Sequence, residues 1–231
     1  DFDFDIYGDK VFVADTYNHQ ILVYDVTGEF ITSIGKKGRG VGQMRSPYGV
    51  AANADYVFVL DTFNNRVSVY THDGTFIRSW GNYSRQISGM RLPYGIAVYN
   101  NSVYVADTQN HRIKQYDLEG NLLNNFGTFG KEDEQFRFSG KIWVVNDMLY
   151  ISDINNHRIK TYYPNGTLAL KFGKRGRGPG EFIFPGGKRY IPSVIGNITK
   201  DLNLTNESVH TKVVPPLIPM GSAGKNNTNS S

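Results

Sequence analysis

Short runs of apolar residues, or of alternating apolar and polar residues, follow one another through the first 190 positions. Residues 56–61 form an apolar run, while residues 66–70 alternate in the way typical of a half-buried strand. Asp73-Gly74 then provides residues suited to the positive φ angles of a tight hairpin turn. No segment keeps a helical period with capping residues, so the pattern predicts an all-β chain. The strands predicted in this stretch are 48–52, 56–61, 66–70 and 75–80.

The pattern repeats with a step of 46 residues and without insertion or deletion at its landmark positions. Four units of four short strands, each too small to bury its own faces, are typical of β-propeller blades. Because the same residues recur in every unit at a constant step, we expect them to have a structural role. The Asp of each unit is Asp15, Asp61, Asp107 and Asp153, and the Asn is Asn18, Asn64, Asn110 and Asn156. Two glycine positions keep the same step, at Gly28, Gly74, Gly120 and Gly166 and at Gly35, Gly81, Gly127 and Gly173.

The residues around this Asp-x-x-Asn motif resemble the NHL repeat, which is named for an Asn-His-Leu core. The resemblance covers roughly residues 3–191 and implies a β-propeller. It implies no single function, because NHL propellers serve as RNA binders, protein-interaction platforms, extracellular modules and occasional enzymes. The matching segments are Val13–Ile21, Val105–Ile113 and Ser152–Ile159, with linker-like segments at Pro93–Ala97 and Gly176–Phe182.

The number of units departs from the family, whose propellers commonly have six blades. Only four full units are present, and a partial fifth begins at Phe184 but has Thr199 where the next Asp is expected. Four blades leave two exposed edges, which proteins generally protect. We therefore expect residues 1–191 to form a propeller that closes as a small ring, recruits its own tail, or pairs with another subunit.

Residues 192–231 form an extended tail rich in Asn, Ser, Thr, Pro and Gly. One segment of it could add as a strand to an open edge, and a Pro-rich segment suits an extended conformation on a neighbouring subunit. The tail is accordingly predicted to join subunits, and wrapping around its own propeller is the alternative. The residues expected to make this contact are Val209, Val213, Val214, Leu217 and Ile218.

Eight Asn-x-Ser/Thr sequons occur, against about 2.5 expected by chance from the amounts of Asn, Ser and Thr. Turns favour Asn and Ser, which explains the sequons of the repeat region as well as glycosylation does. The preference of turns for Asn and Ser explains the cluster of sequons after residue 196 poorly. We therefore expect a secreted or cell-surface protein that carries N-linked glycans. The sequons are at Asn82, Asn100, Asn165, Asn197, Asn203, Asn206, Asn226 and Asn229.

The composition narrows the possible chemistry. The absence of Cys excludes disulfides, Cys-ligated metals and thiol catalysis. No run approaches the length of about 18 apolar residues that a membrane helix needs. The net charge of +4 permits an acidic partner without demanding one.

The repeated Asp and His residues have side chains that could bind a metal or take part in catalysis, but a structural role explains them better. The four Asp side chains could ring a cation such as calcium, but each is better explained as an acceptor of backbone N–H groups from the following loop. His19, His111 and His157 share one repeat position, at which the second unit has Asn65. Residues repeated around a ring diverge, so zinc binding by these histidines is not expected. Some NHL propellers are lyases, but no unit departs from its pattern to introduce a catalytic set.

Nucleic-acid binding has some support from basic loops at residues 36–39 and 174–177, together with many Tyr and Phe. The corresponding loop at 131–134 is acidic, which interrupts the positive surface. The sequence thus predicts a non-enzymatic extracellular glycoprotein without a cofactor, nucleic-acid partner or membrane span. We expect it to polymerise head to tail with itself. The alternative is a monomeric propeller domain of a larger surface protein that binds a peptide or glycan.

Overall fold

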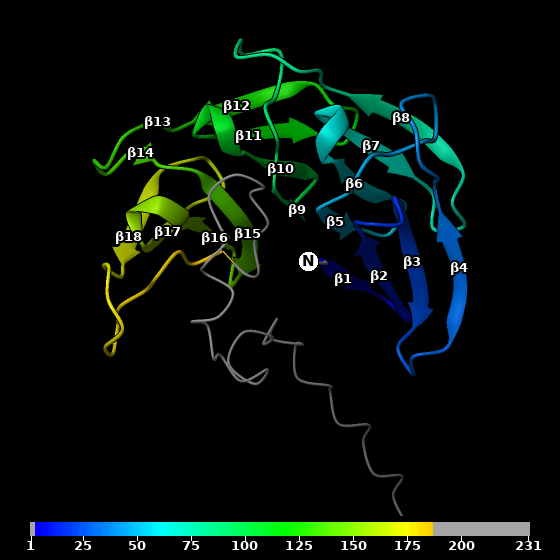
Figure 1. Cartoon of the computed structure of the whole chain (residues 1–231), viewed down its shortest axis with the longest axis horizontal. Coiled ribbons are helices and arrows are strands. Elements are labelled where there is room, and N and C mark those ends of the chain that lie inside the picture. The colour runs from blue at the N-terminus through cyan, green and yellow to red at the C-terminus, as the bar shows by residue number, and fades with distance from the viewer. Residues whose placement is uncertain (1–2, 187–231) are drawn as a thin grey trace, which may run out of the picture. The chain divides into compact units, whose positions relative to one another are not determined.

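The structure is a computed structural model that describes residues 3–186. Its strands form four antiparallel sheets of four strands each, in chain order within each sheet. In Figure 1 the first strand of each sheet lies towards the middle and the fourth at the periphery. These first strands pack side by side, β1 on β5, β5 on β9 and β9 on β15. The predicted four-bladed, all-β propeller arrangement is confirmed.

The blades have nearly identical boundaries relative to the repeat. Blade 1 consists of β1 (Phe4–Tyr7), β2 (Lys10–Asp15), β3 (Gln20–Asp25) and β4 (Phe30–Ile34). Blade 2 consists of β5 (Gly49–Ala52), β6 (Val57–Asp61), β7 (Arg66–Tyr70) and β8 (Phe76–Trp80). Blade 3 consists of β9 (Gly95–Tyr99), β10 (Ser102–Asp107), β11 (Arg112–Asp117) and β12 (Leu122–Phe126). Blade 4 consists of β15 (Ser139–Val145), β16 (Met148–Asp153), β17 (Arg158–Tyr162) and β18 (Leu168–Phe172).

Two smaller features complete the fold. A 3₁₀ turn joins the second and third strands of blades 2, 3 and 4: η1 (Thr62–Asn64), η2 (Thr108–Asn110) and η3 (Ile154–Asn156). The linker between blades 3 and 4 contains a short parallel pair, β13 (Thr128–Phe129) and β14 (Gln135–Phe136). Neither feature is expected from the strand pattern, because both are made by only two or three residues.

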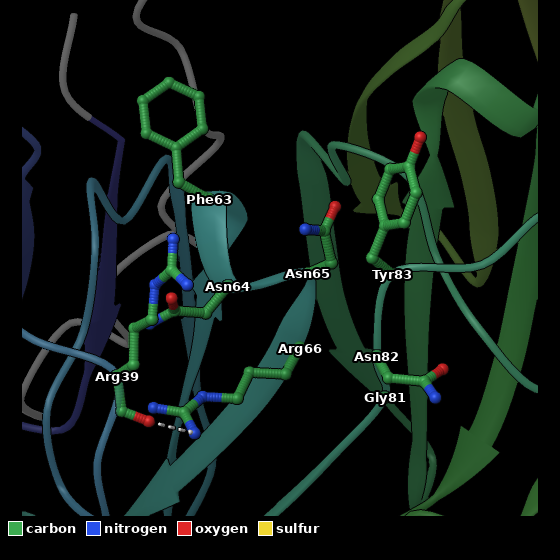
Figure 2. A pocket seen from close by; sticks show the side chains of 8 residues that line it. All are labelled: Arg39, Phe63, Asn64, Asn65, Arg66, Gly81, Asn82 and Tyr83. Carbon is green, nitrogen blue, oxygen red and sulfur yellow. Dashed lines mark hydrogen bonds between the residues drawn. The ribbon is translucent and has the colours of Figure 1, made fainter.

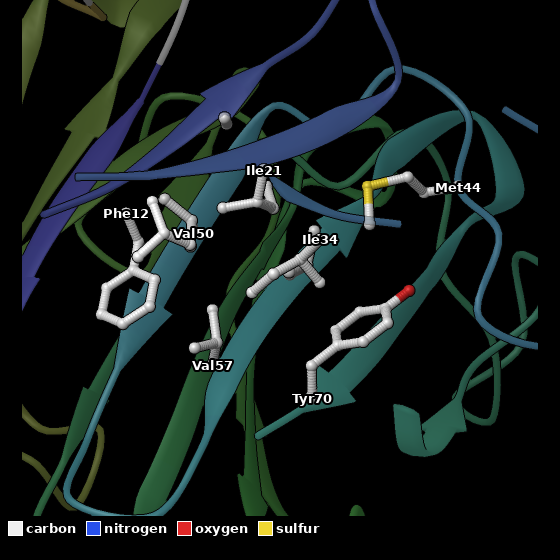
Figure 3. Close-up of a cluster of buried hydrophobic side chains, with 10 residues drawn as sticks. Phe12, Ile21, Ile34, Met44, Val50, Val57 and Tyr70 are labelled. Atoms are coloured by element: carbon white, nitrogen blue, oxygen red, sulfur yellow. The ribbon is translucent and has the colours of Figure 1, made fainter. Parts of the chain in front are cut away.

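Each blade packs against the next through a separate apolar cluster. Figure 3 shows the cluster between blades 1 and 2, where Phe12 and Ile21 meet Val57 and Tyr70, and Met44 of the linker fills the outer part. Two further clusters join blades 2 and 3 and blades 3 and 4. Stacking therefore buries the apolar side chains that a single blade leaves exposed, as the repeat predicts.

We call the end of the propeller that carries the 3₁₀ turns and the blade-to-blade linkers the linker face. The opposite end, which carries the tight hairpin turns, is the hairpin face. The predicted hairpin at Asp73-Gly74 is observed, with Gly74 at a φ of 92°. The partial fifth unit beyond residue 186 and the tail at 192–231 lie outside the described residues, as does the predicted domain boundary between them.

Candidate functional site

The repeated Asp fastens the preceding linker to its blade. The Asp61 carboxylate accepts a hydrogen bond from the backbone N–H of Arg45 at 2.6 Å and from the Asn64 side-chain amide at 2.7 Å. Arg66 Nε donates to the same carboxylate at 2.8 Å, and its Nη2 donates to the carbonyl oxygen of Gly40. Blades 3 and 4 repeat this arrangement through Asp107 with Asn110 and Arg112, and through Asp153 with Asn156 and Arg158.

This arrangement refines the sequence-based interpretation. Backbone N–H groups of the following loop were expected to donate to each Asp, but in blades 2 to 4 the backbone donor belongs to the preceding linker. Only Asp15 of blade 1 follows the expectation, because it accepts from the backbone and side chain of Asn18 and from Gln20. Burial raises the pKa of Asp61, whereas at Asp15 the hydrogen bonds from Asn18 and Gln20 outweigh burial and lower the pKa.

The histidine position of the repeat fastens the following linker. His111 Nδ1 accepts a hydrogen bond from the backbone N–H of Phe138 at 3.1 Å, and Phe138 has a φ of 63°. In blade 2 the side-chain oxygen of Asn65 accepts from Leu92 in the same way, at 2.8 Å. His19 and His157 make the equivalent contacts with Ser46 and Phe184.

Protonation would abolish this role of the histidines. Burial lowers the pKa of His19, His111 and His157, which favours the neutral ring with Nδ1 available as an acceptor. Within residues 3–186, no three His, Asp or Glu side chains are grouped as a metal site would require. In blades 2 to 4 the repeated Asp and Asn side chains bond to the preceding linker, and the His position bonds to the following linker in all four blades.

Two buried lysines were not anticipated from the sequence. Lys114 and Lys160 share one repeat position and are fully buried. Lys114 Nζ donates to the carbonyl oxygens of Ile87 and Gly89, and Lys160 Nζ donates to Gln135 and lies 3.9 Å from the centre of the Phe136 ring. Burial lowers the pKa of each to about 8. A lysine with such a pKa can act as a nucleophile, but both ammonium groups are enclosed and bound to linker carbonyls.

A different set of residues meets where the four innermost strands converge. Asp3, Gly49, Gly95 and Lys141 occupy one repeat position in the four blades. Lys141 Nζ lies 3.0 Å from Asp3 Oδ1, donates to the carbonyl oxygen of Tyr48 at 3.2 Å, and lies 5.4 Å from the centre of the Tyr94 ring. One lysine thus contacts the other three blades. A side chain at Gly95 would collide with the backbone of Gly140 and Lys141.

The linker face carries a pocket between blades 2 and 3, with a volume of about 390 Å³ (Figure 2). Phe63 and Asn65 come from the turn of blade 2, Arg39 from the preceding linker, and Asn82 and Tyr83 from the following linker. Pockets that bind small ligands commonly start at about 300 Å³, so this one has room for a group the size of one sugar ring or amino-acid side chain.

Charge is distributed unequally between the two faces. The turns of the hairpin face carry Asp9, Asp25, Glu29, Asp55, Asp73, Asp117, Glu119 and Asp147, with Lys10 as a basic residue. The linkers carry Lys36, Lys37, Arg39, Arg45, Arg85, Arg91, Lys131, Arg137, Lys174, Arg175 and Arg177. Their acidic residues are Glu132, Asp133, Glu134 and Glu181. The linker face therefore favours anionic partners and the hairpin face disfavours them.

The three sequons within the described residues have exposed asparagines. Asn100 and Asn165 lie in hairpin turns, and Asn82 lies on the linker face beside Tyr83. The side-chain oxygen of Asn165 accepts a hydrogen bond from the backbone N–H of Thr167, so that this bond does not use the side-chain nitrogen to which a glycan would be attached. The sequons at Asn197, Asn203, Asn206, Asn226 and Asn229 lie outside the described residues. So do the predicted assembly residues Val209, Val213, Val214, Leu217 and Ile218.

The end blades keep the residues with which the inner blades stack. Tyr70, Tyr116 and Tyr162 are buried against the preceding blade, whereas the equivalent Tyr24 of blade 1 is partly exposed. On the other side, Phe12, Phe58 and Tyr104 are buried against the following blade, whereas the equivalent Tyr150 of blade 4 is partly exposed. Within residues 3–186 no blade lies against these two faces. Two exposed edges were expected from a four-blade repeat, but the residue-by-residue match of these faces to the inner interfaces emerges only from the structure.

No helix within residues 3–186 has the length and apolar character that crossing a membrane requires. A comparison with curated proteins finds no match for this chain. Comparison with family models matches residues 4–80 to a 6-bladed beta-propeller and residues 90–116 to the NHL repeat. The first match covers blades 1 and 2, and the second covers the inner three strands of blade 3 with their preceding linker residues.

Solved structures with a similar fold have low sequence identity. A catalytically inactive virginiamycin B lyase from Staphylococcus aureus, solved with quinupristin, is 16% identical, with a TM-score of 0.56 over 73% of this chain and 54% of that one. A functionally unknown protein from Desulfotomaculum acetoxidans is 19% identical, with a TM-score of 0.54 over 76% of this chain and 56% of that one. U3-55K is 14% identical, with a TM-score of 0.56 over 73% of this chain and 50% of that one.

This chain spans about half the length of these structures. At such identities the likeness concerns the fold alone, and the lyase among them shows that the fold can support an enzyme. Blade geometry, repeat spacing and the two family matches agree with one another. The chain is therefore a β-propeller protein that contains an NHL repeat.

Proposed function

We propose that the chain is a non-enzymatic extracellular glycoprotein whose propeller assembles head to tail with further copies of itself. The single observation that carries this proposal is the residue-by-residue match between the uncovered end faces and the buried inner interfaces. The face of blade 4 that would meet a following blade is the outgoing face. The face of blade 1 that would meet a preceding blade is the incoming face.

The incoming face repeats the buried side of blades 2 to 4. Val11 and Val13 of β2 correspond to Val57 and Val59 of β6, which are fully buried against blade 1. Phe30 of β4 is 58% exposed, and the corresponding Phe76 packs against the cluster between blades 1 and 2. The incoming face consequently has the side chains of a stacking surface without a blade against it among the described residues.

The outgoing face has the matching set. Ile159 of β17 corresponds to Ile21, Val67 and Ile113, all fully buried, and is itself partly exposed. Phe172 of β18 is 42% exposed and lies in contact with the ring of Phe182. Covering a half-exposed Ile or Phe contributes on the order of 1 kcal/mol, so several together can support association.

Outgoing and incoming faces fit each other three times within the chain, and the same fit between copies is a heterologous contact. Heterologous contacts generate rings when the rotation closes and helical filaments when it does not. The exposed sequon asparagines at Asn82, Asn100 and Asn165 are compatible with this assembly, because they lie at the ends of the blades, away from the stacking side chains.

The absence of catalysis is part of the proposal and rests on how the polar residues are used. The buried Asp carboxylates and the His rings hold linkers, and the two lysines of lowered pKa are enclosed. The alternative function is a monomeric interaction domain of a larger surface protein that binds a peptide or glycan. The exposed side chains of the two end faces are also compatible with further blades supplied by the same polypeptide, and the mass of the chain in solution separates the two cases.

The test uses two charged variants of the full chain, Val13→Lys on the incoming face and Ile159→Lys on the outgoing face. Leu123→Lys, on the exposed side of β12 in blade 3, is the control. Light scattering coupled to size exclusion should show wild type and the control above 26.0 kDa, with mass rising with concentration. Each face variant alone should be a monomer. An equal mixture of both should form dimers and nothing larger, because each partner then has one intact face.

A wild-type chain that stays monomeric at every concentration would contradict self-assembly and favour the interaction-domain alternative. Association that survives both face variants would contradict the end-face contact. The glycoprotein proposal is tested separately by the mass of the chain from a eukaryotic secretory host before and after treatment with an N-glycosidase. A mass that does not change overturns it.

A further inference from the structure

The pocket on the linker face exists where one blade departs from the repeat. In blade 3 the His111 ring lies 4.9 Å from the centres of both the Phe129 and Phe138 rings, so that aromatic side chains fill the space between turn and linker. In blade 2 the equivalent position is Asn65, beside Tyr83 and Leu92. Asparagine keeps the hydrogen bond to the linker N–H at 2.8 Å but removes the ring. The substitution therefore preserves the linker contact and opens the pocket.

The walls of this pocket combine aromatic surface with hydrogen-bond donors. Tyr83 is 66% exposed and Phe63 is 37% exposed, and the two side chains lie on opposite sides of Asn65 in Figure 2. The guanidinium of Arg91 lies 5.7 Å from the centre of the Tyr83 ring, which restrains the ring from the linker side. Arg66 is committed to Asp61 and to linker carbonyls, whereas the exposed Arg39 guanidinium has no hydrogen-bond or ion-pair partner among the described residues.

The surrounding charge favours a short anionic ligand. The linkers that flank the pocket carry six basic residues and no acidic one: Lys36, Lys37, Arg39, Arg45, Arg85 and Arg91. The next linker carries Glu132, Asp133 and Glu134 in succession. A long polyanion that continued from the pocket across blade 3 would meet these carboxylates, and the repulsion would oppose its binding. A nucleic-acid strand is therefore disfavoured, whereas a compact ligand with one carboxylate avoids the acidic linker.

We propose that this pocket binds an acidic carbohydrate, with a uronic-acid carboxylate at Arg39 and the sugar ring against Tyr83. The C–H groups of a pyranose ring carry partial positive charge and suit the negative face of an exposed aromatic ring. A planar guanidinium pairs with a carboxylate through two hydrogen bonds. The site is separate from the end faces, so it goes beyond self-assembly and does not depend on it.

The repeat itself supplies the test variants. Asn65→His fills the pocket with the ring that the other three blades already contain, and its Nδ1 can still accept the N–H of Leu92. His111→Asn makes the reciprocal change in blade 3. Arg39→Gln removes the proposed carboxylate partner without altering the fold, because its side chain is exposed. The full chain is prepared without N-glycans, so that Asn82 carries no glycan of its own that could occupy the pocket.

The probe is a disaccharide of glucuronic acid and N-acetylglucosamine, which carries one carboxylate, titrated by NMR or calorimetry. Wild type and His111→Asn should bind it. Asn65→His should reduce the affinity at least tenfold, and Arg39→Gln should reduce it about tenfold, since the carboxylate loses a charge-assisted pair. The carboxyl-reduced disaccharide should bind wild type and Arg39→Gln equally and weakly.

Several outcomes would overturn the proposal. The proposal is wrong if wild type fails to bind the disaccharide, or if Asn65→His leaves the affinity for it unchanged. Equal affinity for the acidic and the carboxyl-reduced sugar removes the role of the carboxylate. An acidic peptide or a single-stranded oligonucleotide that binds more tightly than the sugar, with the same dependence on Asn65, assigns the pocket to that class of partner instead.

Discussion

The inner and the end blades of this propeller are built from the same repeat but have different surroundings. Tyr104 of blade 3 is buried against blade 4, and its hydroxyl donates to the carbonyl oxygen of Pro164 at 3.1 Å. Tyr150, one repeat later, is partly exposed on the outgoing face. The residue type is identical at the two positions. The comparison shows that the burial of a repeated side chain depends on whether a neighbouring blade covers it. The same substitution at equivalent positions should therefore lower the free energy of unfolding by different amounts.

Between inner and end blades, the largest difference in lost unfolding free energy is expected for the pair Tyr104→Ala and Tyr150→Ala. Truncation of a fully buried aromatic side chain costs about 4 kcal/mol of unfolding free energy, because the cavity in the inner cluster cannot collapse completely. The same truncation at Tyr150 should cost about 1 kcal/mol in the monomer, since part of the ring already faces solvent. Denaturant unfolding at low protein concentration measures both. Equal losses would mean that the outgoing face is covered in solution.

A smaller difference is expected for the repeated Asp. Asp107→Ala leaves Arg112 without its carboxylate and releases the N–H of Arg91, which should cost about 3 kcal/mol because the pair is buried. Asp15→Ala breaks only hydrogen bonds within the turn of blade 1 and should cost about 1 kcal/mol or less. Thermal unfolding of both variants tests this. A loss at Asp15 as large as that at Asp107 would contradict a role for the Asp in holding linkers.

The smallest difference is expected at the hairpin glycines. Gly28 and Gly120 have nearly the same φ, 94° and 97°, so a Cβ strains the backbone at both and costs about 1 kcal/mol. At Gly120 the added Cβ would also collide with the Trp80 ring of blade 2, whereas at Gly28 it meets open space. Gly120→Ala should therefore lose about 1 to 2 kcal/mol more than Gly28→Ala in the same unfolding experiment. Identical losses would show that Trp80 moves aside freely.

The sequence was most informative about elements that the repeat dictates. Residues 66–70 were predicted and observed as a strand with the same limits, and the three other strands of blade 2 agree within one residue. Alternation of side chains and the Asp-Gly turn determine these limits locally. The fold class and the repeat could thus be predicted without three-dimensional information.

The candidate site could be predicted only in part. The Asp positions were identified as structural, but their linker partners lie 16 residues earlier, and no local pattern reveals such a contact. Lys114 and Lys160 were missed because charged residues are generally expected at the surface. The same repeat position is Leu22 in blade 1 and Ser68 in blade 2. An uncharged residue at both would have indicated that the side chain at this position faces the interior. Asn65 was noted as a departure, but the space it opens depends on rings contributed by a linker.

The contact between Lys141 and Asp3 differs in kind from the stacking contacts. A stacking contact joins neighbours, and it would form in the same way in a chain with one blade more or one fewer. The ion pair joins residues three repeats apart, and glycine occupies both intervening repeat positions. Its formation therefore depends on the number of blades between its members. The pair therefore holds the first and the fourth of the described blades at a set distance across the two between them, a constraint that stacking between neighbours does not supply.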